Sequence, residues 1–584
     1  MEIASMRVNA LPCAPLRPPR VLVVGAGIGG LTAAALMARS GIEVQVLEQA
    51  AAPGGKMRQI ELGPQSLDGG PTVLTMRWVF DALFERLGLS LDQHLSLRRC
   101  SVLARHAWGP DQRLDLSADL ETSVAAIAEF SGAAEAQRYR AFCERAGAVY
   151  QTLDRPFMQS SRPTPGSLAW RVLRQQGPSG LRQLLRISPF TSLWTALGRY
   201  FHDPRLRQLF GRYATYCGSS PFEAPATLML VAHVEREAVW QIDGGMYRLA
   251  QALAAAGRQQ GVSYRYGCEV RQLLMRADGG VGGVELQDGE RLSADAVLFN
   301  GDAQALASGL LGQPVQQALG LPAIPPPRSL SALTWHLLAE VEAGGFELSH
   351  HNVLFGPAEH YRAEFDAIAQ GRLPGTPTVY VCAQDRAGDA SGRPPQRAER
   401  LMCLVNAPAM APAMAPASAR ALTEPEIARC QQAMWDQLGR AGLRLKPSPH
   451  APLCTRPQDF AQRFPATGAR STARPARAGG PASSRARIAA RGCRACSWRG
   501  ARCIRGRACR WRRCRASGPP SRSARPCIRH AAGRARRTGP CLRLVVSRRA
   551  ERPAAQRQRL CADPDRLRRQ RVLTLLRLGT AAPG

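Results

Sequence analysis

The sequence predicts an α/β fold, in which a Rossmann-type domain carries an inserted substrate domain of mostly helical plus sheet structure, followed by a disordered, Arg-rich tail. Three observations carry this prediction. A complete strand–turn–helix–strand unit lies at residues 21–48, strand and helix patterns return at residues 246–302, and residues 1–467 are numerous enough for a second domain with its own core.

In the unit at residues 21–48, each residue type has a physical role. Residues 21–24 are four apolar residues that form a buried strand, and a helix-forming run, LTAAALMARSG, follows the turn. Gly25 allows the tight bend, Gly27 lets the backbone approach a pyrophosphate, and Gly30 lets the helix pack close to the strand. The helix N-terminus offers free N–H groups and the positive end of a dipole to phosphates.

The second strand of the unit, residues 44–47, ends in Glu48, 18 residues after Gly30. A carboxylate at this point is placed to accept hydrogen bonds from a ribose hydroxyl, and it would repel the 2′-phosphate of NADP. Residues 21–38 are also free of charge over the length of a membrane span. Their glycine spacing favours a buried strand and a packed helix instead.

Two later turns extend the expected cofactor site. A Pro-Gly-Gly-Lys turn brings a cation within reach of a diphosphate or ribose, and an Asp-Gly-Gly-Pro-Thr turn leaves room for a flat ring because its residues are small. The residues expected to contact the cofactor in these turns are Gly54, Gly55, Lys56, Gly70, Pro71 and Thr72.

The motifs GAGIGGLTAAALMARSG, VQVLEQAAAPGGKMR and LDGGPTVLT resemble the flavoprotein superfamily of amine oxidases and carotenoid desaturases. Within it the chain is most similar to bacterial phytoene desaturases, and GGPTVLTMRWVFDALF is most similar to their hydroxyneurosporene (methoxyneurosporene) desaturase branch. RYATYCGSSPFEAPATLML, WQIDGGMYRLAQALA and DAVLFNGDA follow in family order. The resemblance implies bound FAD. It adds Val270, at the adenosine, and Asp302 to the cofactor-binding residues, although an ordinary core strand explains Val270 equally well.

The resemblance divides the chain into six segments. These are an N-terminal leader (1–20), two parts of the FAD-binding domain (21–72 and 226–309), a substrate and membrane-contact region (73–225), a substrate domain (310–467) and the tail (468–584).

The resemblance implies FAD-dependent dehydrogenation of an apolar carotenoid, with C-3,4 desaturation of a 1-hydroxy or 1-methoxy carotenoid as the specific reaction. Oxygen or a quinone would accept the electrons. The alternatives are a phytoene desaturase or carotene isomerase of the same fold, or a non-enzymatic prenyl-binding escort. No catalytic base is identified, because His202, His233 and Asp154 each suit a surface or core position, and no metal site is expected.

Positive charge dominates the residues after Asp154, where Arg171, Arg174, Arg182 and Arg186 lie among apolar residues. These residues form either a solvated helix face or a basic surface that binds anionic lipid, with Trp170, Phe190 and Trp194 at the interface. The cysteines outside the tail show no pairing pattern, and the N-terminal residues lack the apolar core of an export signal. We therefore expect a cytoplasmic protein, peripheral on the inner face of the cell membrane.

The net charge of +34 is concentrated in the tail. Residues 1–467 hold 46 basic and 41 acidic residues, whereas residues 468–584 hold 32 arginines, 3 acidic residues and 8 of the 17 cysteines. Such a composition predicts disorder and binding to polyanions. An RNA-binding arm is one interpretation, and zinc binding is weakly supported because Cys493 and Cys496 form the only CxxC pair of the tail.

A reading-frame change explains the tail better. Bacterial desaturases similar to this chain end in a flavin-binding segment like VHPGPGVPMAAL. With GC-rich codons, the same DNA read from the second base gives CIRGRACRWRRC, which is the sequence of residues 503–514. We therefore predict a frame change near Gly468, and we expect no nucleic-acid partner.

Overall fold

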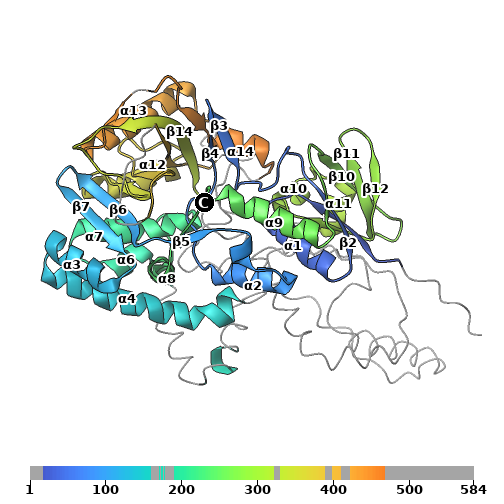
Figure 1. The fold of residues 1–584 in the computed structure, drawn as a ribbon, viewed down its shortest axis with the longest axis horizontal. Helices are drawn as coiled ribbons and strands as arrows, with labels where there is room; N and C mark the ends of the chain where they lie inside the picture. Colours follow the sequence, from blue (N-terminus) through green and yellow to red (C-terminus); the bar gives the residue numbers. More distant parts are fainter. Residues whose placement is uncertain are drawn as a thin grey trace, which may run out of the picture.

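The computed structural model describes residues 17–159, 190–320, 329–388, 398–409, 421–446 and 448–466, with a few positions between 170 and 177. Most of the leader and all of the tail lie outside these residues. A parallel-sheet domain and a larger mixed-sheet domain lie side by side, and helix α9 (Tyr247–Gln259) runs near their junction (Figure 1).

The first domain contains a four-stranded parallel sheet in the order β13-β1-β2-β9. Its strands are β13 (Ala296–Phe299), β1 (Arg20–Val24), β2 (Glu43–Leu47) and β9 (Ser263–Arg265). Side chains of β1 alternate between two cores: Val21 and Val23 pack with α1 (Ile28–Arg39) and α9, whereas Leu22 packs on the opposite face. Because both faces are covered, the strand is a continuous apolar run, as expected for a parallel sheet.

Behind the second face lies a small antiparallel sheet. It consists of β10 (Val270–Met275), β11 (Val281–Leu286) and β12 (Arg291–Ser293), next to α10 (Ala303–Ala307) and α11 (Gln313–Leu319). The pattern of residues 264–275 is typical of a single strand, but the structure divides them between two strands. The chain turns at Gly267, whose φ is +63°, so β9 joins the parallel sheet and β10 the antiparallel one.

The second domain is organised around an eight-stranded mixed sheet in the order β18-β14-β17-β16-β15-β6-β7, with β19 also paired to β14. The strands are β18 (Leu445–Lys446), β14 (Ser331–Val341), β17 (Glu399–Ala407), β16 (Val379–Ala383), β15 (His351–Leu354), β6 (Val102–Gly109), β7 (Gln112–Ser117) and β19 (Leu453–Thr455). Helix α13 (Glu424–Arg440) packs its apolar side chains against this sheet. Helix α12 (Tyr361–Ala369) precedes β16, and α14 (Pro457–Arg463) follows β19.

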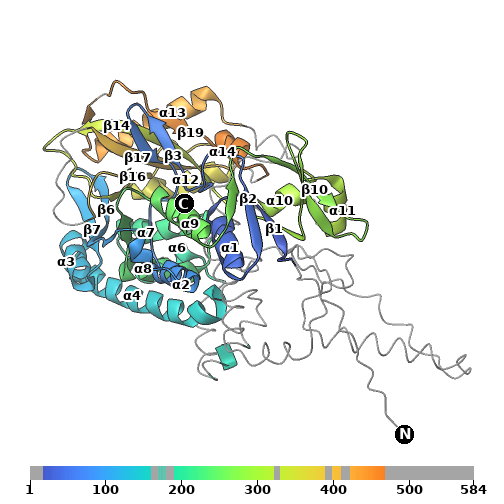
Figure 2. The same cartoon turned by 45° about the vertical axis from the view of Figure 1, so that its right-hand side comes forward.

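A helical layer completes this domain, with the long helix α4 along its lower edge (Figure 2). Its members are α3 (Leu120–Ser131), α4 (Ala133–Leu153), α6 (Leu193–Leu197), α7 (Pro204–Gly211) and α8 (Leu230–Glu237). Residues 73–225, whose pattern is mostly helical, contribute α3, α4, α6 and α7 of this layer and also α2 (Trp78–Leu87). Residues 97–117 are an exception: β6 and β7 join the mixed sheet, and β5 (Leu97–Arg99) belongs to a separate two-stranded sheet.

Two further two-stranded antiparallel sheets are present: β3 (Gln59–Leu62) forms a hairpin with β4 (Gln65–Asp68), and β5 pairs with the distant β8 (Trp240–Ile242).

Part of the basic segment is described. Trp170 and Phe190 are 57% and 81% exposed, and the Arg174 guanidinium lies 5.3 Å from the Trp170 ring centroid. Trp194 differs from the expectation, because it packs against Phe222 and Tyr361 inside the helical layer. Arg171, Arg182 and Arg186 lie outside the described residues. Among the described helices, none is long and apolar enough to cross a bilayer.

Candidate active site

The first glycine turn has the close backbone approach that its sequence predicted. Gly25 has a φ of +99°, and a Cβ on Gly30 would lie 2.1 Å from the Gly25 carbonyl oxygen, so neither position accepts a side chain without a backbone shift. Gly27 is the N-cap of α1, and the first turn of this helix carries neither a side-chain cap nor an acidic residue. Its N–H groups are therefore available to an anion.

Glu48 lies beside this turn at the end of β2. Its carboxylate is 8% exposed and accepts hydrogen bonds from the backbone N–H of Ala26 at 2.6 Å and of Ala50 at 2.9 Å. These bonds hold the acid at the crevice where the strand ends. A carboxylate at that position has acceptor oxygens of the kind that bind ribose hydroxyls.

The second turn packs directly on the first. The Gly54 N–H donates to the Ala26 carbonyl at 2.9 Å, and a Cβ on Gly55 would lie 3.2 Å from the Gly27 Cα. The Lys56 ammonium lies 5.8 Å from the centroid of the Phe464 ring, near the end of the described chain.

The third turn, at Gly70, Pro71 and Thr72, packs on the second. A Cβ on Gly70 would lie 2.2 Å from the Lys56 carbonyl oxygen, and the Thr72 hydroxyl lies 2.7 Å from the Tyr380 hydroxyl of β16. The structure thus brings all three predicted turns together, although 47 positions separate Gly25 from Thr72 in the sequence.

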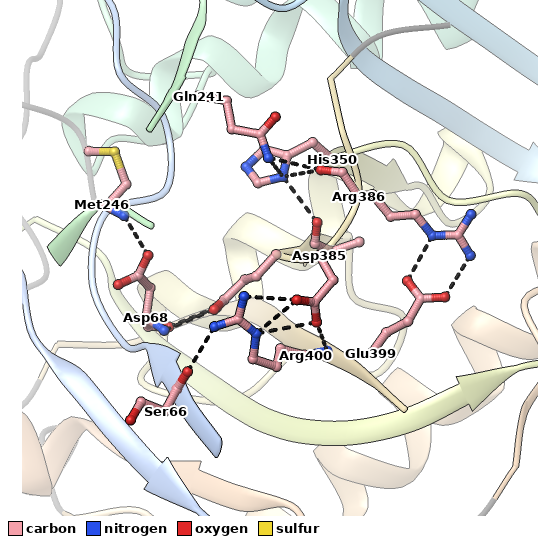
Figure 3. Close-up of polar contacts among 11 residues, drawn as sticks. Ser66, Asp68, Gln241, Met246, His350, Asp385, Arg386, Glu399 and Arg400 are labelled. Carbon is pink, nitrogen blue, oxygen red and sulfur yellow. Dashed lines mark hydrogen bonds and ion pairs between the residues drawn. The ribbon is translucent and has the colours of Figure 1, made fainter. Parts of the chain in front are cut away.

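Asp68 joins this third turn to the rest of the molecule. Its carboxylate accepts hydrogen bonds from the N–H groups of Met246 at 2.5 Å and Tyr247 at 3.1 Å, at the N-terminus of α9 (Figure 3). Gly245 permits this contact, because a Cβ there would lie 2.3 Å from a carboxylate oxygen of Asp68. The side chain of Gln384 then bonds both the N–H and the carbonyl of Asp68, at 2.9 and 3.0 Å.

Charged pairs stiffen the loop that carries Gln384. Arg400 forms paired hydrogen bonds with Asp385 and donates to the carbonyl of Ser66 at 3.0 Å, so it ties β17 to β4 (Figure 3). Arg386 and Glu399 form a buried bidentate ion pair with N–O distances of 2.8 and 2.6 Å. Bidentate pairs of this kind fix geometry as well as energy.

Two histidines lie next to the loop that carries Gln384. Burial lowers the pKa of His350 to about 4, and its Nδ1 lies 3.0 and 3.1 Å from the carbonyls of Ala383 and Arg386. His351 begins β15, and its Nδ1 lies 2.7 Å from the Tyr380 hydroxyl. Ligand atoms of the two histidines and of Cys382 lie within 4.8 Å of one another. Burial raises the pKa of the Cys382 thiol to about 12, so this thiol is protonated at neutral pH.

Val270 and Asp302 lie at the edges of the predicted site. Val270 begins β10, two residues after Cys268, whose N–H donates to the Glu48 carbonyl at 2.9 Å. The Asp302 carboxylate caps α10 by accepting from the Gln304 N–H at 2.8 Å. Asn300 was not among the predicted site residues, but its side-chain N–H donates to the Gly25 carbonyl at 3.3 Å and borders Gly30. Its position directly after a predicted parallel strand was the available signal.

The three residues considered as bases belong to the helical layer. His202 is exposed, and His233 pairs with Glu237 at 3.1 Å on α8. Asp154 is half-buried and accepts from Gln159 at 3.0 Å; burial raises its pKa above the ordinary value. These contacts give His233 and Asp154 a structural role, and His202 lies at the surface.

The same layer contains a buried polar cluster that the sequence analysis did not identify. Arg212 and Glu235 form an ion pair at 3.3 Å, and Tyr213 donates to Glu235 at 2.7 Å. Both charged side chains are less than 10% exposed. Arg212 and Tyr213 occur in the motif RYATYCGSSPFEAPATLML, so the family resemblance was the only signal for them.

The residues of the crevice fit a dinucleotide: three glycine turns leave the backbone bare, a helix N-terminus faces the first turn, and an acid lies at the strand end. Lys56 and Asn300 add polar groups at its border.

The family model described as flavin containing amine oxidoreductase matches residues 28–402. The hydroxyneurosporene desaturase of Rubrivivax gelatinosus is 49% identical over 456 residues, which cover 78% of this chain and 83% of the relative. That of Cereibacter sphaeroides is 44% identical, with 77% and 86% coverage. A phytoene desaturase of Cercospora nicotianae is 34% identical, with 66% and 60% coverage. The chain therefore belongs to the flavin-containing amine oxidoreductases and, among them, to the FAD-dependent carotenoid desaturases.

Proposed function

We propose that this desaturase introduces the C-3,4 double bond of a 1-hydroxy or 1-methoxy carotenoid such as hydroxyneurosporene. The observation that carries the proposal is the identity of 49% and 44% to two hydroxyneurosporene desaturases, against 34% to a phytoene desaturase. The polar groups that meet at Thr72 are consistent with a substrate that carries oxygen.

In this proposal the first two glycine turns bind the diphosphate of FAD, Glu48 binds its ribose, and the third turn leaves room for the flavin ring. Bound FAD supplies the two-electron acceptor for the removal of two hydrogens from neighbouring carbons of the polyene. The chain itself orients the cofactor through the Asp68 junction. Its apolar interior, formed by the helical layer and the mixed sheet, excludes water from the polyene.

The direct test is a reaction of the purified protein with hydroxyneurosporene, followed by absorbance and mass. A desaturase lengthens the conjugated system and removes two hydrogen atoms, so the spectrum shifts to longer wavelength. An isomerase of the same fold leaves the mass unchanged, and an escort protein carries no flavin spectrum. Either of these results would contradict the proposal. The same reaction under nitrogen, with and without a soluble quinone, identifies the electron acceptor.

We further propose that the protein binds the inner face of the cell membrane, where its substrate is dissolved. The exposed Trp170, Leu173 and Phe190 flank a segment rich in arginine, a pattern typical of interfacial binding. Flotation with vesicles of anionic lipid should recover the protein, and replacement of Trp170 and Phe190 by Ser should reduce recovery. Equal recovery of both proteins would contradict this proposal.

We also propose that the arginine-rich tail is an out-of-frame product and binds no nucleic acid in the cell. The support is the run of twelve residues, 503–514, that a one-base shift converts into VHPGPGVPMAAL. Resequencing the gene around codon 468 tests it. If the frame is confirmed as written, a version with the restored frame should still bind FAD more tightly than the chain as written.

A further inference from the structure

A chain of three polar groups leads from the third glycine turn into the substrate domain. The Thr72 hydroxyl lies 2.7 Å from the Tyr380 hydroxyl, and this hydroxyl lies 2.7 Å from Nδ1 of His351. The three residues come from the turn after β4, from β16 and from β15, so the fold alone brings them together.

These three polar groups are not fully enclosed at the Thr72–Tyr380 end. Burial raises the pKa of the Tyr380 and Tyr216 hydroxyls, yet both residues keep some exposed surface. The neighbours of Tyr380 along β16, Val379 and Val381, have no exposed surface. Thr72 is also half-buried, so its side chain shares this accessible surface beside the turn.

The polar groups of the neighbouring Arg212–Glu235 cluster are already paired. The Tyr216 hydroxyl donates to Glu235 and accepts from Arg212 at 3.0 Å. Glu235 also accepts from Tyr213 and Arg212, so both of its oxygens are occupied. Among the hydroxyls considered, the Thr72–Tyr380–His351 chain is the one that keeps hydrogen-bonding capacity for a ligand.

That capacity follows from counting protons. Burial and the nearby Arg212 and His350 hold the pKa of His351 well below its ordinary value, so the ring is neutral and carries one proton. The Tyr380 hydroxyl also contacts the Cys382 thiol, which is protonated and can donate to the tyrosine oxygen in either arrangement. If Nδ1 is the acceptor, Tyr380 donates to His351 and Thr72 donates to Tyr380, which leaves the Thr72 oxygen free to accept. If Nδ1 carries the proton, every bond reverses: His351 donates to Tyr380, Tyr380 donates to Thr72, and the Thr72 hydroxyl is free to donate.

We propose that the Thr72 hydroxyl binds the oxygen atom near the end of the carotenoid, and that Tyr380 and His351 are positioning residues that set its direction. This inference rests on the proposed function. A substrate hydroxyl donates to Thr72 in one His351 tautomer, and a methoxy oxygen accepts from Thr72 in the other. One site therefore recognises both end groups, and it holds the neighbouring carbons at the turn that contacts the flavin.

The reversal needs a ring in which either nitrogen can carry the proton. Nε2 of His351 is buried and has no hydrogen-bond partner within the described ranges, so neither tautomer is fixed from that side. A buried nitrogen without a hydrogen-bond partner lowers the stability of a protein core. Its presence is explained if the His351 ring must be able to adopt either tautomer.

The test compares hydroxyneurosporene with neurosporene, which lacks the oxygen, on the full-length protein. The ratio of their kcat/KM values should fall about tenfold to a hundredfold in Tyr380→Phe and Thr72→Val, because a lost hydrogen bond to a buried partner costs discrimination of this size. Thr72→Ser should keep the ratio. Tyr361→Phe is the matched control, because it removes another buried hydroxyl of the same domain that has no partner among the described residues.

Binding gives a second measurement that does not depend on turnover. The dissociation constant of hydroxyneurosporene, from quenching of tryptophan fluorescence, should rise in Tyr380→Phe, whereas that of neurosporene should change little. Phenylalanine cannot hydrogen-bond to Tyr380, so His351→Phe no longer sets the direction of the Tyr380–Thr72 hydrogen bond. This variant should bind the hydroxy and the methoxy carotenoid with less preference over neurosporene.

Two failures are distinguishable. If the wild type desaturates hydroxyneurosporene but Tyr380→Phe and Thr72→Val keep its ratio and affinities, the proposed function stands and this inference is wrong. If the wild type desaturates neither oxygenated carotenoid, both are wrong.

Discussion

Replacement of Asp68 by Asn tests the junction between the third glycine turn and α9. The Asp68 carboxylate accepts two backbone N–H bonds at the N-terminus of this helix, from Met246 and Tyr247. Asparagine has one acceptor oxygen, so its NH₂ group must face one of these N–H donors, and that donor becomes unsatisfied in a buried site. Asp68 itself is 8% exposed.

The expected cost follows from these contacts. A hydrogen bond to a charged group contributes about 1.5–3 kcal/mol, and an unsatisfied buried donor costs about 1–3 kcal/mol. Burial is the largest influence on the pKa of Asp68 and raises it, so the charged form is itself disfavoured and its removal offsets part of the loss. We therefore expect Asp68→Asn to lower the free energy of unfolding by about 2–3 kcal/mol.

The assay is urea denaturation followed by circular dichroism, together with the FAD dissociation constant. Asp243→Asn is the matched control, because it makes the same chemical change one residue before the Gly244–Gly245 turn. The Asp243 side chain is 41% exposed and pairs with Arg98, and a surface pair of this kind is worth about 0–1 kcal/mol. We expect FAD binding to weaken only in Asp68→Asn. If the two variants differ by less than about 1 kcal/mol and bind FAD equally, the reasoning about the junction is refuted.

Three further predictions concern the glycine turn, the buried ion pair and pH. Gly30→Ala should abolish FAD binding measured by flavin absorbance, because its Cβ would lie 2.1 Å from the Gly25 carbonyl oxygen. Arg386→Met should lower the free energy of unfolding by about 3–5 kcal/mol in urea denaturation, because it leaves the Glu399 carboxylate buried and unpaired. Burial lowers the pKa of His336 to about 4 in the folded protein. As the pH falls below about 6.5, the unfolded chain takes up a proton at this histidine while the folded protein does not. The contribution of the neutral His336 to the free energy of unfolding is therefore full above about pH 6.5 and is lost as the pH falls toward 4.

Each of these predictions has a control variant and an outcome that would contradict it. Gly41 has a positive φ but open space around it, so Gly41→Ala should lower stability while FAD stays bound. Loss of flavin in Gly41→Ala as well would contradict the argument from close backbone approach. Arg98→Met removes an exposed pair, and an equal effect from it would contradict the burial argument. For pH, the midpoint of thermal unfolding should fall between pH 6.5 and pH 5. His336→Gln should make this decline smaller but not remove it, because the buried His350 and His351 contribute in the same direction; an unchanged decline would show that His336 does not contribute.

The sequence by itself determined the nucleotide-binding half of this protein. Residues 21–24 and 44–47 were predicted as strands, and the structure has β1 at Arg20–Val24 and β2 at Glu43–Leu47. Such elements are readable because apolar runs, glycine sterics and a strand-end acid act over a few neighbouring residues. The three glycine turns were identified for the same reason, and the family resemblance supplied the cofactor and the substrate class.

Only the tertiary structure decided which distant groups meet. Asp68 acts on α9 across 178 positions of sequence, and Thr72 meets Tyr380 across 308. No local pattern encodes such pairs, because they depend on how the mixed sheet packs against the turn. Residues 97–117 illustrate the same limit: β6 and β7 pair with each other locally, but the place of β6 in the mixed sheet depends on β15, and β5 depends on β8. Periodicity fixes an element, and long-range packing fixes its neighbours.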